Sequence, residues 1–211
     1  MNRRETTRFL TELLIRERLT DRKYYAREVT LDYGTGNEKR VDVMQFKPRG
    51  VTYVSDIEAG QFICYEIKSC KEDVYSGNGL NFVGDENYIV TTMECYKSLI
   101  PDIQSGKLQD HVKDINGGNK ANYDFLIAVR DNSGVMSRFS PDKALSDEFE
   151  NPSPLNDKIS WWRLAKMQGI KSGYNKNSTG RTRSMTELLF CMLRAKHSDT
   201  NNKKQTVLEN I

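Results

Sequence analysis

Charged side chains interrupt an apolar face of the most strand-like segment in the chain, QFICYEIKS at residues 61–69. Successive side chains of a strand point to opposite faces, so the two faces of this segment follow directly from its sequence. The alternation places on one face Phe62, Cys64, Glu66 and Lys68. The other face is apolar, which is typical of a strand that a helix covers. We therefore expect a sheet flanked by helices, with a carboxylate and an ammonium group on a buried face.

Asp42 interrupts an apolar face of the preceding predicted strand, residues 39–47, in the same way. It shares a face with Met44 and points away from the two valines beside it. If the two strands are neighbours, Asp42 and Glu66 converge with Lys68 beside them. Charged groups on a buried face are costly unless they are paired or bind an ion. A structural ion pair between Glu66 and Lys68 is the plainer explanation, and the pattern alone leaves it open.

A divalent cation would allow Asp42 and Glu66 to stay ionised side by side, since two such carboxylates otherwise repel each other. Mg²⁺, or Mn²⁺ in its place, prefers hard oxygen ligands and keeps several waters, one of which can act as a nucleophile. The backbone carbonyl of Ile67 is a candidate third ligand. Lys68 would orient or deprotonate the attacking water, or stabilise charge on a phosphate. The pattern thus predicts metal-dependent hydrolysis of a phosphodiester bond.

The spacing of these residues resembles the signature of the PD-(D/E)XK nuclease superfamily: Asp42, then Glu66-Ile67-Lys68 at the end of a buried strand. The proline that usually precedes the aspartate is replaced by Val41. The resemblance implies a restriction-endonuclease-like core of helix, three-stranded meander, helix and strand. Residues 24–92 are more narrowly similar to MmcB-like DNA repair proteins, in which a strand glutamate, an R-x-D-V element and an EIKS element occur in this order.

Further acidic residues are weaker candidates for the same site. Glu28, on the predicted strand 24–33, is a candidate third catalytic acid, and a surface charge is the alternative. Superfamily members often add a glutamate from the first helix, and the chain offers three: Glu5, Glu12 and Glu17. Asp73 would either orient Lys68 or act as a favourable charge at a helix N-terminus.

The rest of the pattern predicts an α/β (or α+β) architecture, a mixed sheet flanked by helices. We expect helices over residues 3–19, from 93 to Pro101, over 159–170 and over 184–197. Further strands are expected over 88–92 and 123–130, and residues 51–57 either extend the sheet or form a loop. The domain organisation that follows is a nuclease-like core at 1–154, a basic helical segment at 155–197 packed on it, and a flexible tail at 198–211.

Basic residues concentrate near the C-terminus. Residues 155–197 hold nine lysines and arginines against two acids, whereas the whole chain carries a net charge of only +3. Such a segment is compatible with binding the phosphate backbone of DNA, and a solvated helical face is the alternative. The candidate nucleic-acid contacts are Lys171, Lys176, Arg181 and Arg183.

Several classes of protein are disfavoured. No apolar run approaches the roughly 18 residues that span a bilayer, and the start, MNRRETTRFL, lacks a signal-peptide core, so we expect a cytoplasmic protein without membrane contact. The four cysteines form no C-x-x-C pair, and two histidines leave little material for a histidine-based site.

Three hypotheses remain. The first is a DNA endonuclease or other DNA-processing phosphodiesterase of a repair, phage or mobile-element system, for which double-strand cutting would favour a homodimer. The second is a DNA-binding protein with an inactive nuclease fold. The third is a protein unrelated to nucleic acid, in which the buried charges are structural.

Overall fold

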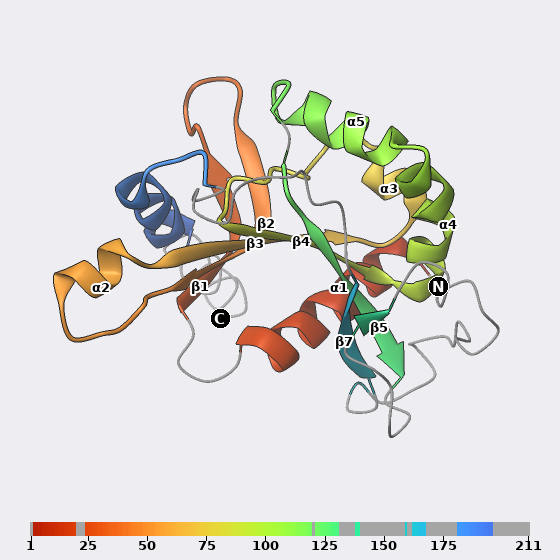
Figure 1. Cartoon of the computed structure of the whole chain (residues 1–211), viewed down its shortest axis with the longest axis horizontal. Coiled ribbons are helices and arrows are strands. Elements are labelled where there is room, and N and C mark those ends of the chain that lie inside the picture. The colour runs from red at the N-terminus through yellow and green to blue at the C-terminus, as the bar shows by residue number, and fades with distance from the viewer. Residues whose placement is uncertain are drawn as a thin grey trace, which may run out of the picture.

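A mixed sheet of seven strands, in the order β1-β2-β3-β4-β5-β7-β6, runs through the protein (Figure 1). The computed structural model describes residues 2–19, 24–119, 121–130, 138–139, 159, 162–167 and 181–195, and every structural statement here concerns these residues. The strands are β1 (Tyr24–Leu31), β2 (Lys39–Lys47), β3 (Gln61–Lys68), β4 (Glu86–Thr92), β5 (Asp124–Arg130), β6 (Arg138–Phe139) and β7 (Trp162–Met167). The helices are α1 (Arg3–Leu14, continued by a π-helical turn over Ile15–Leu19), α2 (Val54–Glu58), α3 (Lys71–Val74), α4 (Met93–Gln104), α5 (Lys107–Ile115) and residues 185–195.

Helix α1 covers one face of the sheet. It begins at Arg3 because the side chain of Asn2 accepts hydrogen bonds from the first-turn amides and Glu5 completes a capping box. Its apolar stripe, which includes Leu10 and Leu13, packs against the face of β3 that Tyr65 and Ile67 occupy. The apolar face predicted for this strand is therefore covered by a helix, as expected.

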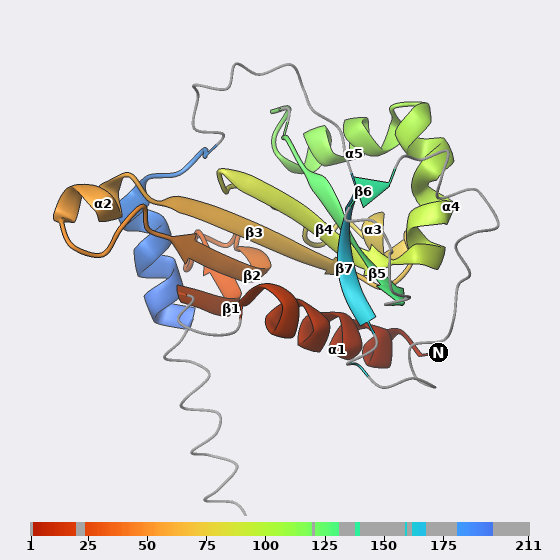
Figure 2. The ribbon, with the colours of Figure 1, turned by 60° about the horizontal axis from the view of Figure 1, so that its bottom comes forward.

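Two separate groups of helices cover the other face (Figure 2). Residues 185–195 lie over β1, β2 and the start of β3, where they bury Met44, Phe62 and Cys64. Helices α4 and α5 lie over β4, β5 and β7. Residues 76–83, which we call the 76–83 loop, contribute to both apolar clusters through Leu80 and Val83. The end of β3 that carries Glu66 and Lys68 lies beneath this loop.

The pairing of the strands follows the order that the resemblance implies. Strands β1, β2 and β3 form an antiparallel meander, and a crossover containing α3 leads to β4, which is parallel to β3. The prediction of a mixed sheet flanked by helices, with a helix near the C-terminus, is confirmed. Among the described residues, no helix combines the length and the apolarity needed to cross a membrane.

The helix predicted over residues 159–170 is wrong, because this segment contains β7, which pairs with β5 and β6. Both faces of β7 are buried: Trp162 and Leu164 pack on the side of α1, whereas Ala165 and Met167 pack on the side of α4. The resulting apolar spacing imitates the period of a helix. One strand of the central sheet therefore comes from the segment that we expected to be helical, and the tail at 198–211 lies outside the described residues.

Two other helix predictions need correction. Helix α4 does not end at Pro101 but continues to Gln104 with the proline inside it. A proline removes one intrahelical hydrogen bond, and here the burial of Leu99 and Ile100 offsets that loss. Residues 51–57, expected to be strand or loop, include most of the short exposed helix α2, and no element was expected where α5 lies.

Candidate functional site

Glu66 and Lys68 are both buried at the end of β3, as the alternation of side chains predicts. Glu66 is 0% exposed and Lys68 is 4% exposed. The neighbouring strand β4 places Ile89 beside Glu66 and Thr91 beside Lys68. Two groups that normally carry charge therefore lie inside the protein with an apolar residue and a hydroxyl as their nearest strand neighbours.

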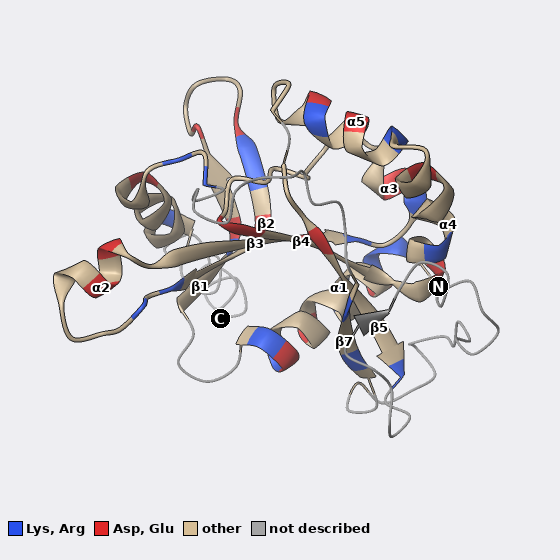
Figure 3. Ribbon diagram, viewed as in Figure 1, with Lys and Arg blue, Asp and Glu red and all other residues tan. Residues whose placement is uncertain are grey.

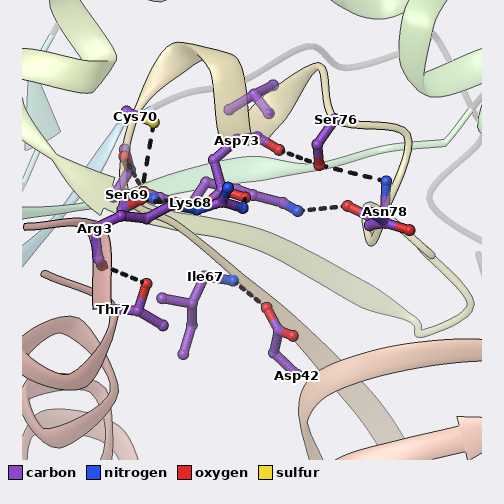
Figure 4. A network of polar contacts seen from close by, with 12 residues as sticks. Arg3, Thr7, Asp42, Ile67, Lys68, Ser69, Cys70, Asp73, Ser76 and Asn78 are labelled. Atoms are coloured by element: carbon purple, nitrogen blue, oxygen red, sulfur yellow. Dashed lines mark hydrogen bonds and ion pairs between the residues drawn. The ribbon is translucent and has the colours of Figure 1, made fainter. Parts of the chain in front are cut away.

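The backbone of the 76–83 loop covers both heads, and its contact with Lys68 is drawn in Figure 4. The ammonium of Lys68 donates to the carbonyl oxygen of Asn78 at 2.6 Å, and the amide of Asn81 donates to Oε1 of Glu66 at 3.3 Å. Gly79 makes the close approach possible, because a Cβ there would lie 2.5 Å from Oε2 of Glu66 and 2.7 Å from Nζ of Lys68. The sequence pattern did not identify these loop residues, and the glycines at 77 and 79 were its one signal.

The plainer explanation for the two charges does not hold within the described residues. Glu66 and Lys68 form no ion pair there within 4.0 Å, and the ammonium donates to a backbone carbonyl instead. Oε2 of Glu66 is buried and has no hydrogen-bond partner in the described structure. A buried carboxylate oxygen without a partner is costly, so a cation is a natural occupant for its surroundings.

Asp42 lies beside this pair because its side chain takes over the pairing of β2 with β3. The regular ladder ends at Val43 opposite Tyr65, and Oδ2 of Asp42 then accepts the amide of Ile67 at 2.8 Å (Figure 4). The structure thus brings Asp42 and Glu66 together on neighbouring strands. It places the amide of Ile67, rather than its carbonyl, against the aspartate.

Burial raises the pKa of both carboxyl groups of the site. Burial raises the pKa of Glu66 well above its ordinary range, and the negative charge of Asp42 raises it further. Burial also raises the pKa of Asp42, although the amide of Ile67 and the charge of Lys68 oppose that rise. Both shifts favour a proton or a cation at this position.

A divalent cation fits this donor set. Asp42 and Glu66 would hold it, and Mg²⁺ is commonly bound through only one or two carboxylates with water completing its shell. The described residues contain no group of three or more histidine, cysteine, aspartate or glutamate side chains arranged to hold a metal. The remaining ligands would therefore be water or backbone carbonyls, of which that of Ile67 is our predicted one.

The weaker acidic candidates Glu28 and Asp73 lie near Asp42, but each is bound to residues other than Asp42, Glu66 and Lys68. Glu28 lies opposite Asp42 in the β1–β2 pairing, with a left-handed φ of 53°, and its carboxylate forms an ion pair of 2.8 Å with Arg40. Asp73 accepts from the amide and hydroxyl of Ser69 and pairs with Arg3, so it does not contact Lys68.

The three glutamates of the first helix separate into two groups. Glu5 and Glu12 line a groove of about 930 Å³ that also reaches Asp42 and lies between α1 and β1. Glu17 pairs with Arg16 and with Arg163 on β7 and does not line that groove. Glu66 and Lys68 are likewise absent from the groove lining, because they lie on the opposite face of the sheet from α1, beneath the 76–83 loop.

The predicted nucleic-acid contacts lie elsewhere or outside the described residues. Arg183 binds Asp32 with both terminal nitrogens, at 2.8 and 2.7 Å, and also pairs with Glu187. Arg181 lies 3.6 Å from the carboxylate of Asp85, a residue that directly precedes β4 and accepts the amide of Phe62 in β3. Lys171 and Lys176 fall outside the described residues. On helices α4 and α5, basic and acidic positions are interspersed (Figure 3).

Comparison with known proteins adds no assignment: the chain matches no family model, no curated protein and no solved structure. Function is therefore inferred from the geometry of Asp42, Glu66 and Lys68.

Proposed function

We propose that this protein is a metal-dependent nuclease that hydrolyses phosphodiester bonds in DNA in the cytoplasm. The observation that carries the proposal is the buried, unpartnered Oε2 of Glu66 beside a second carboxylate, Asp42. The meander of β1–β3 followed by the parallel strand β4 supports it, since the PD-(D/E)XK resemblance implies that order. The similarity of residues 24–92 to MmcB-like DNA repair proteins also favours DNA as the substrate.

The proposal assigns distinct roles to the three residues. Asp42 and Glu66 would hold Mg²⁺ or Mn²⁺, which would supply charge neutralisation and a more acidic water. Lys68 would orient the attacking water or stabilise charge that develops on the phosphate. Because Asn78 now accepts the hydrogen bond of this ammonium, the 76–83 loop has to move before Lys68 can reach a substrate.

Asp42→Asn and Lys68→Ala are each expected to reduce DNA cleavage at least a hundredfold, because they remove a metal ligand and a positioned cation respectively. Plasmid incubated with Mg²⁺ or Mn²⁺ and analysed on gels gives the measurement. Asp110→Asn is the control, since Asp110 is an exposed acid on α5 away from the site. Cleavage that survives both substitutions would rule the proposal out.

A second candidate is a DNA-binding protein that does not cut, and the loop covering Glu66 and Lys68 favours it. It predicts salt-sensitive DNA binding with no cleavage at any metal concentration tested. Glu28, as a third acid, and a homodimer that addresses both strands remain parts of the first proposal. The mass of the protein in solution, measured with and without DNA, tests the dimer.

A further inference from the structure

The groove beside Asp42 has two walls of different origin. Helix α1 forms one wall, and β1 with the neighbouring part of β2 forms the other. Asp42 and Ile67 lie among its lining residues, so the groove leads to the edge of the proposed site. Its volume of about 930 Å³ is at the upper end of the range for small-molecule pockets.

Each wall carries an arginine whose side chain has no partner among the described residues. Arg4 on α1 and Arg27 on β1 are exposed and line the groove, and within the described residues their side chains form no hydrogen bond or ion pair. The other two arginines of the lining are engaged: Arg3 pairs with Asp73, and Arg8 lies 3.9 Å from Glu12.

The acidic residues of the lining are, in contrast, all engaged locally. Glu5 accepts from the amide of Asn2, Glu28 pairs with Arg40, and Asp42 accepts from Ile67. Arg4 and Arg27 are therefore the cations of the lining that have no partner among the described residues, whereas Glu5 and Asp42, whose donors are neutral amides, keep their negative charge. A ligand that meets both walls at once would need two anionic groups or an extended anionic chain.

The described lining contains no aromatic ring. Proteins that read the bases of a nucleic-acid strand usually stack them on aromatic side chains, whereas arginines that contact phosphates bind without regard to sequence. The lining chemistry thus matches a sugar–phosphate backbone and not exposed bases.

We propose that this groove binds the phosphodiester backbone of a nucleic acid, with Arg4 and Arg27 contacting phosphates from opposite walls. The inference rests on the proposed function for its placement beside Asp42. It adds the residues that hold the substrate, and it predicts binding that is independent of base sequence.

Arg4→Ala and Arg27→Ala are each expected to raise the dissociation constant for duplex DNA about tenfold, as expected for loss of a charge-assisted contact. Each should also reduce the slope of log K against log salt by about 1. Fluorescence anisotropy in EDTA measures both without cleavage, on two duplexes of unrelated sequence and on an RNA duplex. The matched control is Arg49→Ala, an exposed arginine outside the groove, which should change the constant less than twofold.

Unchanged binding by the double variant, an equal loss in Arg49→Ala, or a loss confined to one sequence would overturn the inference. Thermal unfolding of each variant checks that the fold is kept, and Arg4→Lys should retain part of the affinity. The two proposals can be contradicted separately. If the Arg4 and Arg27 variants lose DNA binding but the unsubstituted protein shows no metal-dependent cleavage, the groove is supported and the nuclease activity is ruled out. If cleavage depends on Asp42 but not on Arg4 and Arg27, the nuclease activity is supported and the groove is ruled out.

Discussion

Replacing Gly79 with alanine is expected to lower the free energy of unfolding by about 2–4 kcal/mol, whereas the same change at Gly77 should lower it by about 1–2 kcal/mol. Both glycines have a left-handed backbone, with φ of 80° at Gly79 and 77° at Gly77, so the conformational penalty is shared. The added methyl at Gly77 would meet nothing within 4 Å. At Gly79 it would press on the ends of Glu66 and Lys68.

Neither of those side chains has room to retreat. Both are almost completely buried, and the ammonium of Lys68 already donates to Asn78. Accommodating a methyl group at Gly79 therefore requires the 76–83 loop or the end of β3 to shift. That loop is also held from the other side, since the side chain of Asn116 donates to the carbonyl of Leu80 at 2.9 Å.

Denaturant unfolding of the two alanine variants at neutral pH measures the difference directly. Equal losses of stability at Gly77 and Gly79 would contradict the packing of this loop on the two charged heads. If the protein is a nuclease, cleavage gives a second readout: the Gly79 variant should lose activity because Glu66 and Lys68 are displaced, and the Gly77 variant should retain most of it.

Replacing Glu66 with glutamine is expected to raise the free energy of unfolding of the metal-free protein at neutral pH by about 1–3 kcal/mol. The substitution keeps the shape of the side chain and removes a buried charge that lies beside Asp42. Glu94→Gln, at an exposed position on α4, is the control and should leave stability nearly unchanged.

The effect of this substitution should depend on pH in one direction. Burial raises the pKa of Glu66 above its ordinary value of 4.5, so the folded state prefers the protonated form. That preference stabilises the native protein fully below pH 4.5, and the stabilisation is lost as pH rises through the folded pKa. The glutamine variant lacks this loss, so the difference between its free energy of unfolding and that of the unsubstituted protein should be small in acid and grow toward neutral pH.

Mn²⁺ should make the unsubstituted protein more stable than the Glu66→Gln variant, the reverse of the order expected without metal. A cation held by Asp42 and Glu66 would raise the unfolding temperature of the unsubstituted protein, more at pH 8 than at pH 5, and would leave the glutamine variant almost unaffected. Thermal scans over pH with and without Mn²⁺ provide the test. An unsubstituted protein that is more stable than the variant at neutral pH without metal would contradict the described burial of this carboxylate.

The features of the site that the sequence predicted are local ones. Alternation along β3 is a property of neighbouring residues, so it placed Glu66 and Lys68 on one face without knowledge of the rest of the fold. The convergence of Asp42 required one further assumption, that two consecutive strands pair. Strand pairing of this kind is the commonest connection in a sheet.

The features that escaped prediction depend on contacts between distant segments. Strand β7 buries apolar side chains on both faces because α1 and α4 cover it from opposite sides, and its own sequence cannot distinguish that from a helix. The 76–83 loop is held by Asn116 and by the carbonyl of Arg40, which are far away in sequence. For the same reason, the sequence did not predict the ion pair of Arg183 with Asp32, which links the segment before the C-terminal helix to the turn after β1.

That link has a consequence for how the protein is made. The first three strands bury one of their faces against residues 185–195, and Arg183 and Arg194 attach that helix to β1 and the turn after it. At synthesis rates of about 5–20 residues per second, roughly ten seconds pass between the synthesis of β3 and that of residues 185–195, which cover this apolar face. The nascent chain is therefore expected to need chaperone protection at β1–β3, and stop codons shortly before residue 185 should yield aggregates rather than a shortened folded protein.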